Sequence, residues 1–483
     1  MRLISCLPLV SLLAVAMTAW SPAAAGAASR PNVVLIVSDD MGYADLPGFG
    51  MNMGIPMPQM DRLRTGGVSF TNAYASAPIC VVSRMGMYTG RNQARWGVYE
   101  NVYDGNPAYI KFQREKTIAS YFKEAGYATS LVGKWHLSGN GNILDQPPDF
   151  LPDAKGFDEI TIIPGGMSSY QPGTLLYRKG GSFIPAPEHL TDYFGHLAAD
   201  FIQRKKDEPF FLLLAFNAVH APLHALEKDI EEFGSLKGYD SGTYVPELAV
   251  ANRNVRRDRE VYSGMMRAFD RNIGRVLDAL SQAGVSGETL VVYVNDNGGP
   301  ALDTPVHSYN EASNLPYRGG KFDCLEGGIR VPMVISWPGH IPTSRRYGTF
   351  TGLTSSLDIL PTVLAACGIS APKDRPLDGT NLIPFLNQTP VSDPHNSLCW
   401  QGFFLDEKNT GQAAIRQGKW KLHQYASVVA GPRLEDWALY DLTADPGEKR
   451  DLSRDHPGKV KELDDDWRKW KAEMQPLALA KSK

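Results

Sequence analysis

The sequence predicts an α/β fold with a large, mostly parallel sheet flanked by helices, followed by a smaller C-terminal antiparallel sheet domain with a closing helix. Continuous apolar, β-branched runs recur along residues 31–336, as is typical of strands buried on both faces of a parallel sheet. Helical stretches alternate with these runs. From about residue 371 the strand-like pieces become shorter, and turn residues divide them. We therefore expect an α/β domain at residues 29–370, large enough to be a catalytic domain, and a C-terminal α+β subdomain at residues 371–483.

The first 28 residues have the features of a signal peptide. A leucine- and valine-rich run at residues 7–15 is followed by small residues at positions 23–28, which form a cleavage region. That run is too short to span a bilayer, and no later apolar segment reaches the roughly 20 residues of a membrane helix. We expect a mature protein that is periplasmic or secreted, with no membrane partner.

The strands and helices of both domains can be placed along the chain. Strands of the large sheet are expected at residues 31–38, 129–132, 210–216, 290–294 and 331–336, and helices at residues 117–124, 194–205 and 262–283. Strands of the smaller sheet are expected at residues 413–416, 419–423 and 438–441. Leu463, Trp467 and Trp470 recur at helical spacing, which predicts an amphipathic closing helix over residues 460–474.

Polar clusters follow four of the predicted strands. They are Asp39-Asp40, Lys134-Trp-His136, Asn217-Ala-Val-His220 and Asn295-Asp-Asn297. Ligands of parallel sheets collect beyond the carboxyl ends of the strands, so we expect these four clusters to form one site.

Charge and cysteine content narrow the functional classes. A net charge of −3 over 483 residues argues against a nucleic-acid-binding protein. Of five cysteines, Cys6 leaves with the signal peptide, and the other four are Cys80, Cys324, Cys367 and Cys399. In an oxidising compartment these form two disulfides in one of three pairings, unless Cys80 is chemically special. The sequence leaves both interpretations open.

Motifs in a shared order identify a family resemblance. The motifs are Asp39-Asp-Met-Gly-Tyr-Ala-Asp45, Cys80-Val-Val-Ser-Arg84, Thr89-Gly-Arg91, Gly133-Lys-Trp-His-Leu137, Asn217-Ala-Val-His-Ala-Pro222, Asn295-Asp-Asn-Gly-Gly299, Arg318-Gly-Gly-Lys321, Glu326-Gly-Gly-Ile-Arg-Val-Pro332, Leu439-Tyr-Asp-Leu442 and Asp445-Pro-Gly-Glu448. With them the chain resembles a formylglycine-dependent (type I) sulfatase of the alkaline-phosphatase superfamily, from residue 31 to about residue 452.

The resemblance implies that Cys80 is the precursor of formylglycine, made by a formylglycine-generating maturation enzyme. The hydrate of this aldehyde would attack sulfur and later expel sulfate as the carbonyl re-forms, which a plain thiol cannot do. This sequence has Val82 where the family has proline or alanine. Family members place the modified residue at a helix start, where proline suits the first turn and valine is a weaker helix former.

The resemblance also implies a metal site made by Asp39, Asp40, Asp296, Asn297 and the oxidised Cys80. Carboxylate and amide oxygens are hard ligands, so the expected cation is Ca²⁺, with Mg²⁺ as the alternative.

Basic side chains complete the implied site. Lys134 and Lys321 would contact the sulfate oxygens, and Arg84 would orient the hydrated aldehyde. His136 would take a proton from the hydrate, and His220 would protonate the leaving oxygen. The remaining assignments are His224, expected to face the substrate, and Arg91, expected to support the Cys80 helix.

The sequence also indicates a class of substrate. The exported location and the motifs at residues 217–222 and 326–332 favour a sulfated carbohydrate over a small aryl sulfate. The loops at residues 163–184 and 301–315 carry side chains that would grip a sugar, unless they are ordinary surface loops: Tyr170, Tyr177, Arg178, Lys179, His307 and Tyr309. Two other functions stay open: a phosphate or phosphonate monoester hydrolase on the same fold, and a non-catalytic protein that binds sulfated glycans and keeps Cys80 unconverted.

Overall fold

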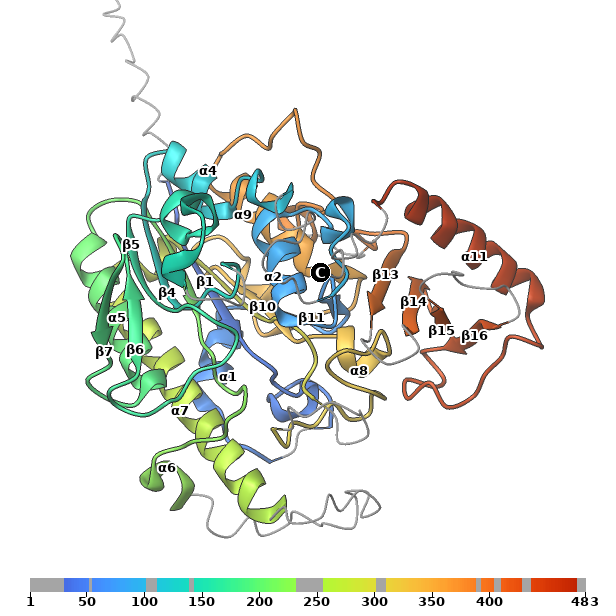
Figure 1. The fold of residues 1–483 in the computed structure, drawn as a ribbon, viewed down its shortest axis with the longest axis horizontal. Helices are drawn as coiled ribbons and strands as arrows, with labels where there is room; N and C mark the ends of the chain where they lie inside the picture. The colour runs from blue at the N-terminus through green and yellow to red at the C-terminus, as the bar shows by residue number, and fades with distance from the viewer. Residues whose placement is uncertain are drawn as a thin grey trace, which may run out of the picture.

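The computed structural model describes residues 30–51, 54–100, 111–138, 143–231, 255–300, 310–387, 392–403, 410–427 and 436–475. The expected signal peptide at residues 1–28 lies outside them. A ten-stranded sheet in the order β11-β2-β10-β9-β1-β8-β4-β5-β6-β7 forms the centre of the molecule (Figure 1). Its strands are β1 Asn32–Ser38, β2 Gly67–Phe70, β4 Ala128–Lys134, β5 Glu159–Ile163, β6 Leu175–Arg178, β7 Ser182–Pro185, β8 Phe210–Ala215, β9 Thr289–Asn295, β10 Met333–Ser336 and β11 Gly348–Phe350.

The middle of this sheet is parallel. Strands β9, β1, β8, β4 and β5 all run in the same direction, and Val34 of β1 pairs with Leu212 of β8 and Val291 of β9. Strand β10 is antiparallel to both β9 and β2. The predicted mostly parallel sheet is confirmed, although the apolar run of β10 gave no sign of its reversed direction.

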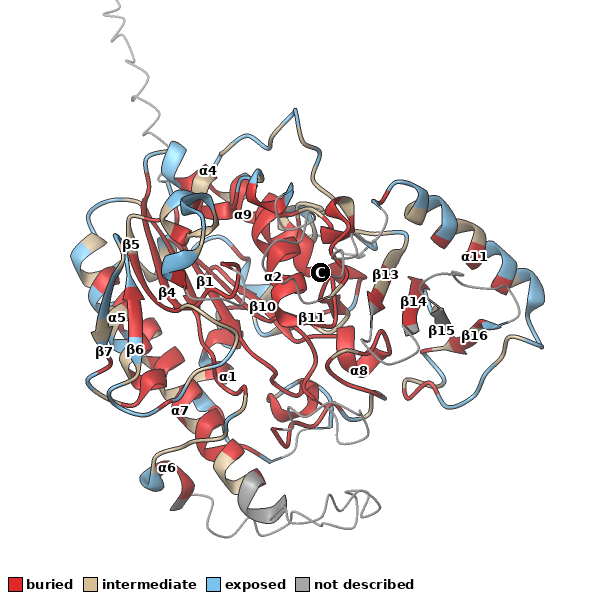
Figure 2. Cartoon of the chain, viewed as in Figure 1, coloured by how far each residue is buried: buried red, intermediate tan, exposed pale blue. Residues whose placement is uncertain are grey.

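Helices cover both faces of the sheet. Alternate residues of β1 point to opposite sides, so Val34 and Ile36 pack with α1, α5 and α7, and Leu35 packs with α2, α4 and α9. Figure 2 shows the buried residues concentrated along the sheet and the inner sides of these helices. The helices are α1 Pro58–Thr65, α2 Cys80–Thr89, α4 Ile118–Glu124, α5 Leu190–Lys205, α6 Glu227–Glu231, α7 Val255–Gln282, α8 Glu326–Ile329, α9 Ile359–Ala366, α10 Ile383–Asn387 and α11 Pro457–Ala472. None of the helices in the described ranges is both long enough and apolar enough to cross a bilayer.

The smaller sheet is an antiparallel meander. It contains β13 Leu398–Phe403, β14 Thr410–Gln417, β15 Trp420–Ser427 and β16 Ala438–Asp441. Helix α11 packs Leu463 and Trp467 against Ile415 and Leu422 of this sheet. The predicted antiparallel sheet and closing helix are therefore confirmed. The short strands β3 Ala73–Tyr74 and β12 Thr354–Ser355 form a separate parallel pair.

The boundary between residues 370 and 371 stays a prediction. Leu382 and Leu386, just beyond it, pack with the core of the large sheet.

Candidate active site

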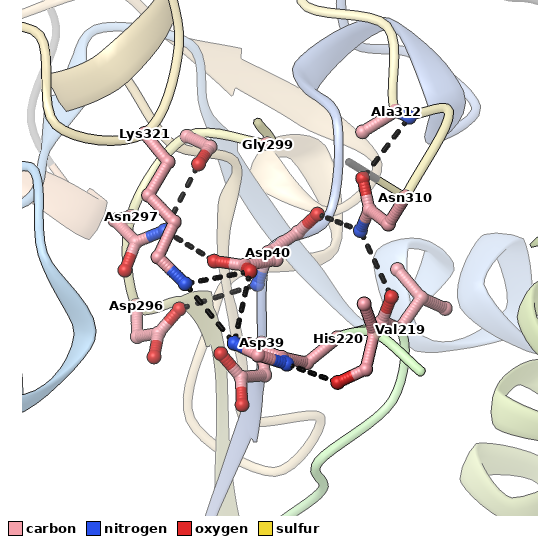
Figure 3. Close-up of polar contacts among 12 residues, drawn as sticks. Asp39, Asp40, Val219, His220, Asp296, Asn297, Gly299, Asn310, Ala312 and Lys321 are labelled. Carbon is pink, nitrogen blue, oxygen red and sulfur yellow. Dashed lines mark hydrogen bonds and ion pairs between the residues drawn. The ribbon is translucent and has the colours of Figure 1, made fainter. Parts of the chain in front are cut away.

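The four polar clusters predicted to form one site do meet at the carboxyl edge of the large sheet. Strand β1 ends at Ser38, β4 at Lys134, β8 at Ala215 and β9 at Asn295, and all four strands are parallel neighbours. Figure 3 shows the side chains that follow β1, β8 and β9 pointing toward one another, with Lys321 reaching in from a later segment. The polar residues that follow the carboxyl ends of neighbouring parallel strands come together in this way.

Asp39 and Asp296 lie on one side of the site with two basic residues. Lys134 Nζ lies 2.5 Å from Asp39 Oδ2, and Arg84 Nε and Nη2 each lie 2.9 Å from Asp296 Oδ2. All four side chains are fully buried. Burial alone would raise the pKa of Asp39, but the nearby Lys134 charge helps to hold that pKa well below its usual value. Burial raises the pKa of Asp296, and the neighbouring Asp39 charge adds to the rise.

Asp40 lies on the other side of the site and holds three polar side chains. Lys321 Nζ donates to its Oδ2 at 2.8 Å, and Asn297 Nδ2 donates to its Oδ1 at 2.8 Å (Figure 3). His220 Nε2 lies 3.4 Å from Oδ2. The Asp40 backbone has a φ of 60°, a left-handed conformation rare for a residue with a Cβ. This bend turns the second acid of the pair away from the strand direction and into the site.

Cys80 begins helix α2 beside the carboxylates. Its Sγ and carboxylate oxygens of Asp39 and Asp296 lie within 4.8 Å of one another. Burial raises the pKa of the Cys80 thiol, so at neutral pH the unmodified side chain is a protonated thiol and a poor nucleophile. Cys80, Cys324, Cys367 and Cys399 are all free, which excludes the two-disulfide interpretation in this structure.

Val82 lies in the first turn of α2 and is fully buried in the core between the helices and the sheet. The helix starts at Cys80 with Ile79 at the N-cap, and the Ser83 N–H donates to the Ile79 carbonyl at 2.8 Å. Valine therefore supports the same helix start that the family resemblance implied, through packing of its side chain.

Both histidines predicted to be catalytic lie in the site, where burial favours their neutral forms. Burial lowers the pKa of His136 well below its usual value, and the Lys134 charge lowers it further. Burial and the Lys321 charge lower the pKa of His220 to about 4. His220 Nδ1 lies 2.5 Å from the Ala221 carbonyl, so Nδ1 carries the proton and Nε2 accepts from Lys321 Nζ at 3.1 Å.

The oxygen atoms of the site fit a hard divalent cation. Asp39 Oδ1 and Asn297 Oδ1 are buried and accept no hydrogen bond from any residue in the described part of the chain. Buried acceptors are normally satisfied, so two such oxygens in one site indicate a ligand that is a cation or a donor. Together with the carboxylates of Asp40 and Asp296 they form the all-oxygen set that suits Ca²⁺ or Mg²⁺.

Three residues that support the site were not assigned this role from the sequence. Asn310 Nδ2 donates to the carbonyls of Asp40 and Val219, each at 2.8 Å, and so ties the ends of β1 and β8 together (Figure 3). Tyr170 Oη lies 2.5 Å from the Asn217 carbonyl and 2.8 Å from the His220 carbonyl. Asn295 Nδ2 donates to the Met41 carbonyl at 2.8 Å. Asn295 belongs to a motif, but nothing in the sequence near Asn310 or Tyr170 indicates their distant partners.

The expectation that Tyr170 and Tyr177 stack on a sugar is wrong. Each residue is only 1% exposed and packs in the hydrophobic core, so neither ring can stack on a sugar. Arg178 and Lys179 are exposed. His307 and Tyr309 lie outside the described residues.

The structure also places the last two assigned residues, His224 and Arg91. His224 is half-buried, and its ring stacks on His189 with 5.4 Å between the ring centroids. Arg91 follows helix α2 and donates to Glu115 at 2.7 Å, so it ties the far end of the Cys80 helix to a neighbouring segment.

Comparisons with known proteins agree with this geometry. Residues 31–369 match the family model Sulfatase, and residues 321–473 match the model N-sulphoglucosamine sulphohydrolase, C-terminal. The chain is 30% identical to N-acetylgalactosamine-6-sulfatase of Homo sapiens, over 89% of this chain and 83% of that protein. It is also 30% identical to arylsulfatase A of Homo sapiens, over 88% and 84% of the two chains. The crystal structure of Ps i-CgsB in complex with k-i-k-neocarrahexaose is 29% identical, with a TM-score of 0.77 over 94% of this chain and 95% of that one.

Proposed function

This chain belongs to the type I sulfatases of the alkaline-phosphatase superfamily and is a sulfuric ester hydrolase, and we propose that it acts on a sulfated carbohydrate through a formylglycine made from Cys80 and a divalent cation. The observation that carries the proposal is the balance of charge around Cys80. Three carboxylates, from Asp39, Asp40 and Asp296, face three basic side chains, from Arg84, Lys134 and Lys321. These charges cancel, so a bound divalent cation leaves the buried site positive and ready for an anionic sulfate ester.

The cation and the modified Cys80 have separate roles in this proposal. Asp39, Asp40, Asp296 and Asn297 would hold Ca²⁺ or Mg²⁺, which supplies fixed positive charge next to the sulfate, while oxidised Cys80 supplies the attacking hydroxyl. Lys134 contacts Asp39 and Lys321 contacts Asp40, so the two ammonium groups can contact different sulfate oxygens. Arg84 holds Asp296 through two nitrogen atoms and keeps that carboxylate in place.

The histidines are assigned to proton transfer. His220 Nε2 accepts from Lys321 Nζ on the side where the leaving oxygen departs in the proposal, so the proton that passes to that oxygen comes from Lys321 through His220. His136 follows Lys134 with a φ of 60°, and its Nδ1 has no hydrogen-bond partner in the described ranges, so this nitrogen is free to take a proton. His224 would contact the substrate from the edge of the site.

Two further parts of the proposal concern substrate and location. The names of two relatives support a carbohydrate: one is an N-acetylgalactosamine-6-sulfatase, and the other was crystallised with a neocarrahexaose. The N-terminal 28 residues support export to the periplasm or the medium. A formylglycine-generating enzyme is the partner that converts Cys80 in this proposal.

The test is a comparison of substrates with matched cysteine variants. The protein, made in a host with sulfatase-maturing activity, is assayed with a panel of sulfated oligosaccharides, an aryl sulfate and the matching aryl phosphate. We expect release of sulfate from an oligosaccharide, loss of that activity in Cys80→Ala, and retention of it in Cys367→Ala, which removes a buried thiol outside the site.

Each competing function predicts a different result in this assay. Preferred turnover of the phosphate would support a phosphate or phosphonate ester hydrolase. Binding of sulfated oligosaccharides without turnover, unchanged in Cys80→Ala, would support a non-catalytic glycan-binding protein. Turnover of the aryl sulfate alone would overturn the carbohydrate assignment.

A further inference from the structure

The residue after Lys321 has an unusual backbone. Phe322 has a φ of 78°, in the left-handed region that side chains with a Cβ rarely adopt. Such conformations persist where the surrounding structure holds them, and they cluster at functional sites. Because Phe322 is bonded directly to Lys321, whatever holds this backbone also fixes where the lysine side chain starts.

Phe322 is held from two sides. Its N–H donates to the carbonyl of Pro78 at 2.8 Å, two residues before Cys80. Its carbonyl accepts a hydrogen bond from Gln412 Nε2 at 2.9 Å. Gln412 belongs to β14, so the second contact comes from the smaller sheet, 90 residues further along the chain.

The same glutamine makes a second bond to this segment. The Cys324 N–H donates to Gln412 Oε1 at 2.7 Å, so one side-chain amide connects the residues on either side of Asp323. A primary amide can donate and accept at the same time, which a carboxylate cannot do. Gln412 is 1% exposed and Cys324 is fully buried, so the bond between these two residues is shielded from water.

The ends of the segment are also held by the C-terminal part of the chain. At residue 318, Arg318 Nη1 donates to the Glu448 carbonyl at 3.0 Å. At residue 326, the Glu326 N–H donates to Glu448 Oε2 at 2.7 Å, and Lys421 Nζ lies 3.1 Å from Glu326 Oε1. Residues 318–326 are therefore attached to the smaller sheet and its following loop at both ends, and Gln412 attaches the middle.

We infer that Gln412 is a positioning residue for Lys321 and that the smaller sheet is thereby part of the catalytic apparatus. The inference rests on the proposed function, in which Lys321 holds the sulfate group. Gln412 fixes the carbonyl of Phe322, the Pro78 contact fixes its N–H, and the two bonds together set the direction of Lys321 toward Asp40 and His220.

The test compares two glutamines of one strand. Gln412→Met keeps the size of the side chain and removes both amide bonds. Gln417→Met is the matched control, because Gln417 is also on β14 but its amide faces Asp466 of α11, at 3.4 Å. We expect Gln412→Met to lower kcat about 10- to 100-fold, to weaken competitive inhibition by inorganic sulfate and to change KM little, because misplaced catalytic groups lose rate before affinity for the rest of the substrate. Gln417→Met is expected to keep the kinetic constants of the unaltered protein.

Amide hydrogen exchange of residues 318–326, read by mass spectrometry, keeps the test independent of turnover. We expect faster exchange of this segment in Gln412→Met, and no change there in Gln417→Met. Equal exchange and equal kcat in the two variants would overturn the inference. Failure of the unaltered protein to hydrolyse any sulfate ester would overturn the proposed function instead, while the exchange rates would still decide whether Gln412 holds this segment.

Discussion

Lys321 donates a hydrogen bond from Nζ to Nε2 of His220 at 3.1 Å, across 101 residues of sequence. His220 Nδ1 faces the Ala221 carbonyl, so Nε2 has to be the acceptor and the imidazole is neutral. The proton nearest to the expected leaving oxygen is therefore on Lys321, and the two side chains act as a pair. Burial and the Lys321 charge, which lower the pKa of His220 to about 4, favour this arrangement.

The roles of His220 and His136 can be separated with two substrates whose leaving oxygens differ in their need for a proton. A sugar oxygen needs a proton as it leaves, whereas a nitrophenolate does not. We expect His220→Gln to lower kcat on a sugar sulfate by about 10²- to 10⁴-fold and on 4-nitrophenyl sulfate far less. His136→Gln should slow both substrates to a similar degree. Equal losses on the two substrates for His220→Gln would assign His220 to another step.

The second prediction concerns the cation. Removal by a chelator is expected to abolish turnover and to lower the melting temperature, because the buried oxygens Asp39 Oδ1 and Asn297 Oδ1 then lose their partner. A cation present at 100 times its Kd would stabilise the folded state by about 2.7 kcal/mol. Adding back Ca²⁺ or Mg²⁺ separately, followed by scanning calorimetry and assay, identifies the ion. Unchanged activity and melting temperature in the chelator would contradict the metal site.

The third prediction tests the Tyr170 hydroxyl as a support for His220. Tyr170→Phe keeps the buried ring but removes the contacts to the carbonyls of Asn217 and His220. We expect a fall in kcat of about 10-fold and a loss of roughly 1–3 kcal/mol in the free energy of unfolding. Tyr177→Phe is the control, because its hydroxyl bonds Asp153 at 2.9 Å, away from the site. A matching fall in kcat for both variants would show a general structural effect.

The central strands and the acids that follow them could be predicted because each strand is buried on both faces. The apolar runs of β1 and β9 end at Ser38 and Asn295, so Asp39 and Asp296 were expected to be neighbours, and they are. The direction of β10 could not be predicted in this way. A short strand buried on both faces has the same apolar pattern whether its neighbours are parallel or antiparallel.

The polar contacts that support the site could not be predicted from the sequence, for a different reason. Gln412 bonds two backbone groups that lie 88 and 90 residues away, and backbone groups carry no sequence signal. Tyr170 appeared as a loop aromatic available to a sugar, whereas the loop folds under residues 217–220 and buries it. Strand β13 has Cys399 and Trp400 but no long apolar alternation, so residues 398–403 were not predicted as a strand.

The fourth prediction is a pH dependence of stability that arises far from the site. Burial opposes ionisation of Asp192, but hydrogen bonds from Arg271 and Asn272 lower its pKa from 3.8 to about 2. The ionised form is therefore stabilised by folding; the contribution is complete above about pH 4 and is lost as the pH falls toward 2. Asp192→Asn should lower the free energy of unfolding at pH 7 by about 1–3 kcal/mol, with a smaller difference at pH 3.

Urea unfolding at pH 7, 5 and 3 checks this prediction. The control is Asp200→Asn, which breaks an exposed ion pair with Arg204 on the same helix and should change stability little at any pH. A difference between Asp192→Asn and the unaltered protein that stays constant from pH 7 to pH 3 would contradict the assigned shift.

The most direct measurement is the chemical state of Cys80. The protein is recovered from a host with sulfatase-maturing activity, and the tryptic peptide covering residues 65–84 is analysed by mass spectrometry. The account predicts that the thiol is replaced by an aldehyde or its hydrate, in spite of Val82. An intact thiol in this peptide, alongside an oxidised control sulfatase from the same host, would contradict it.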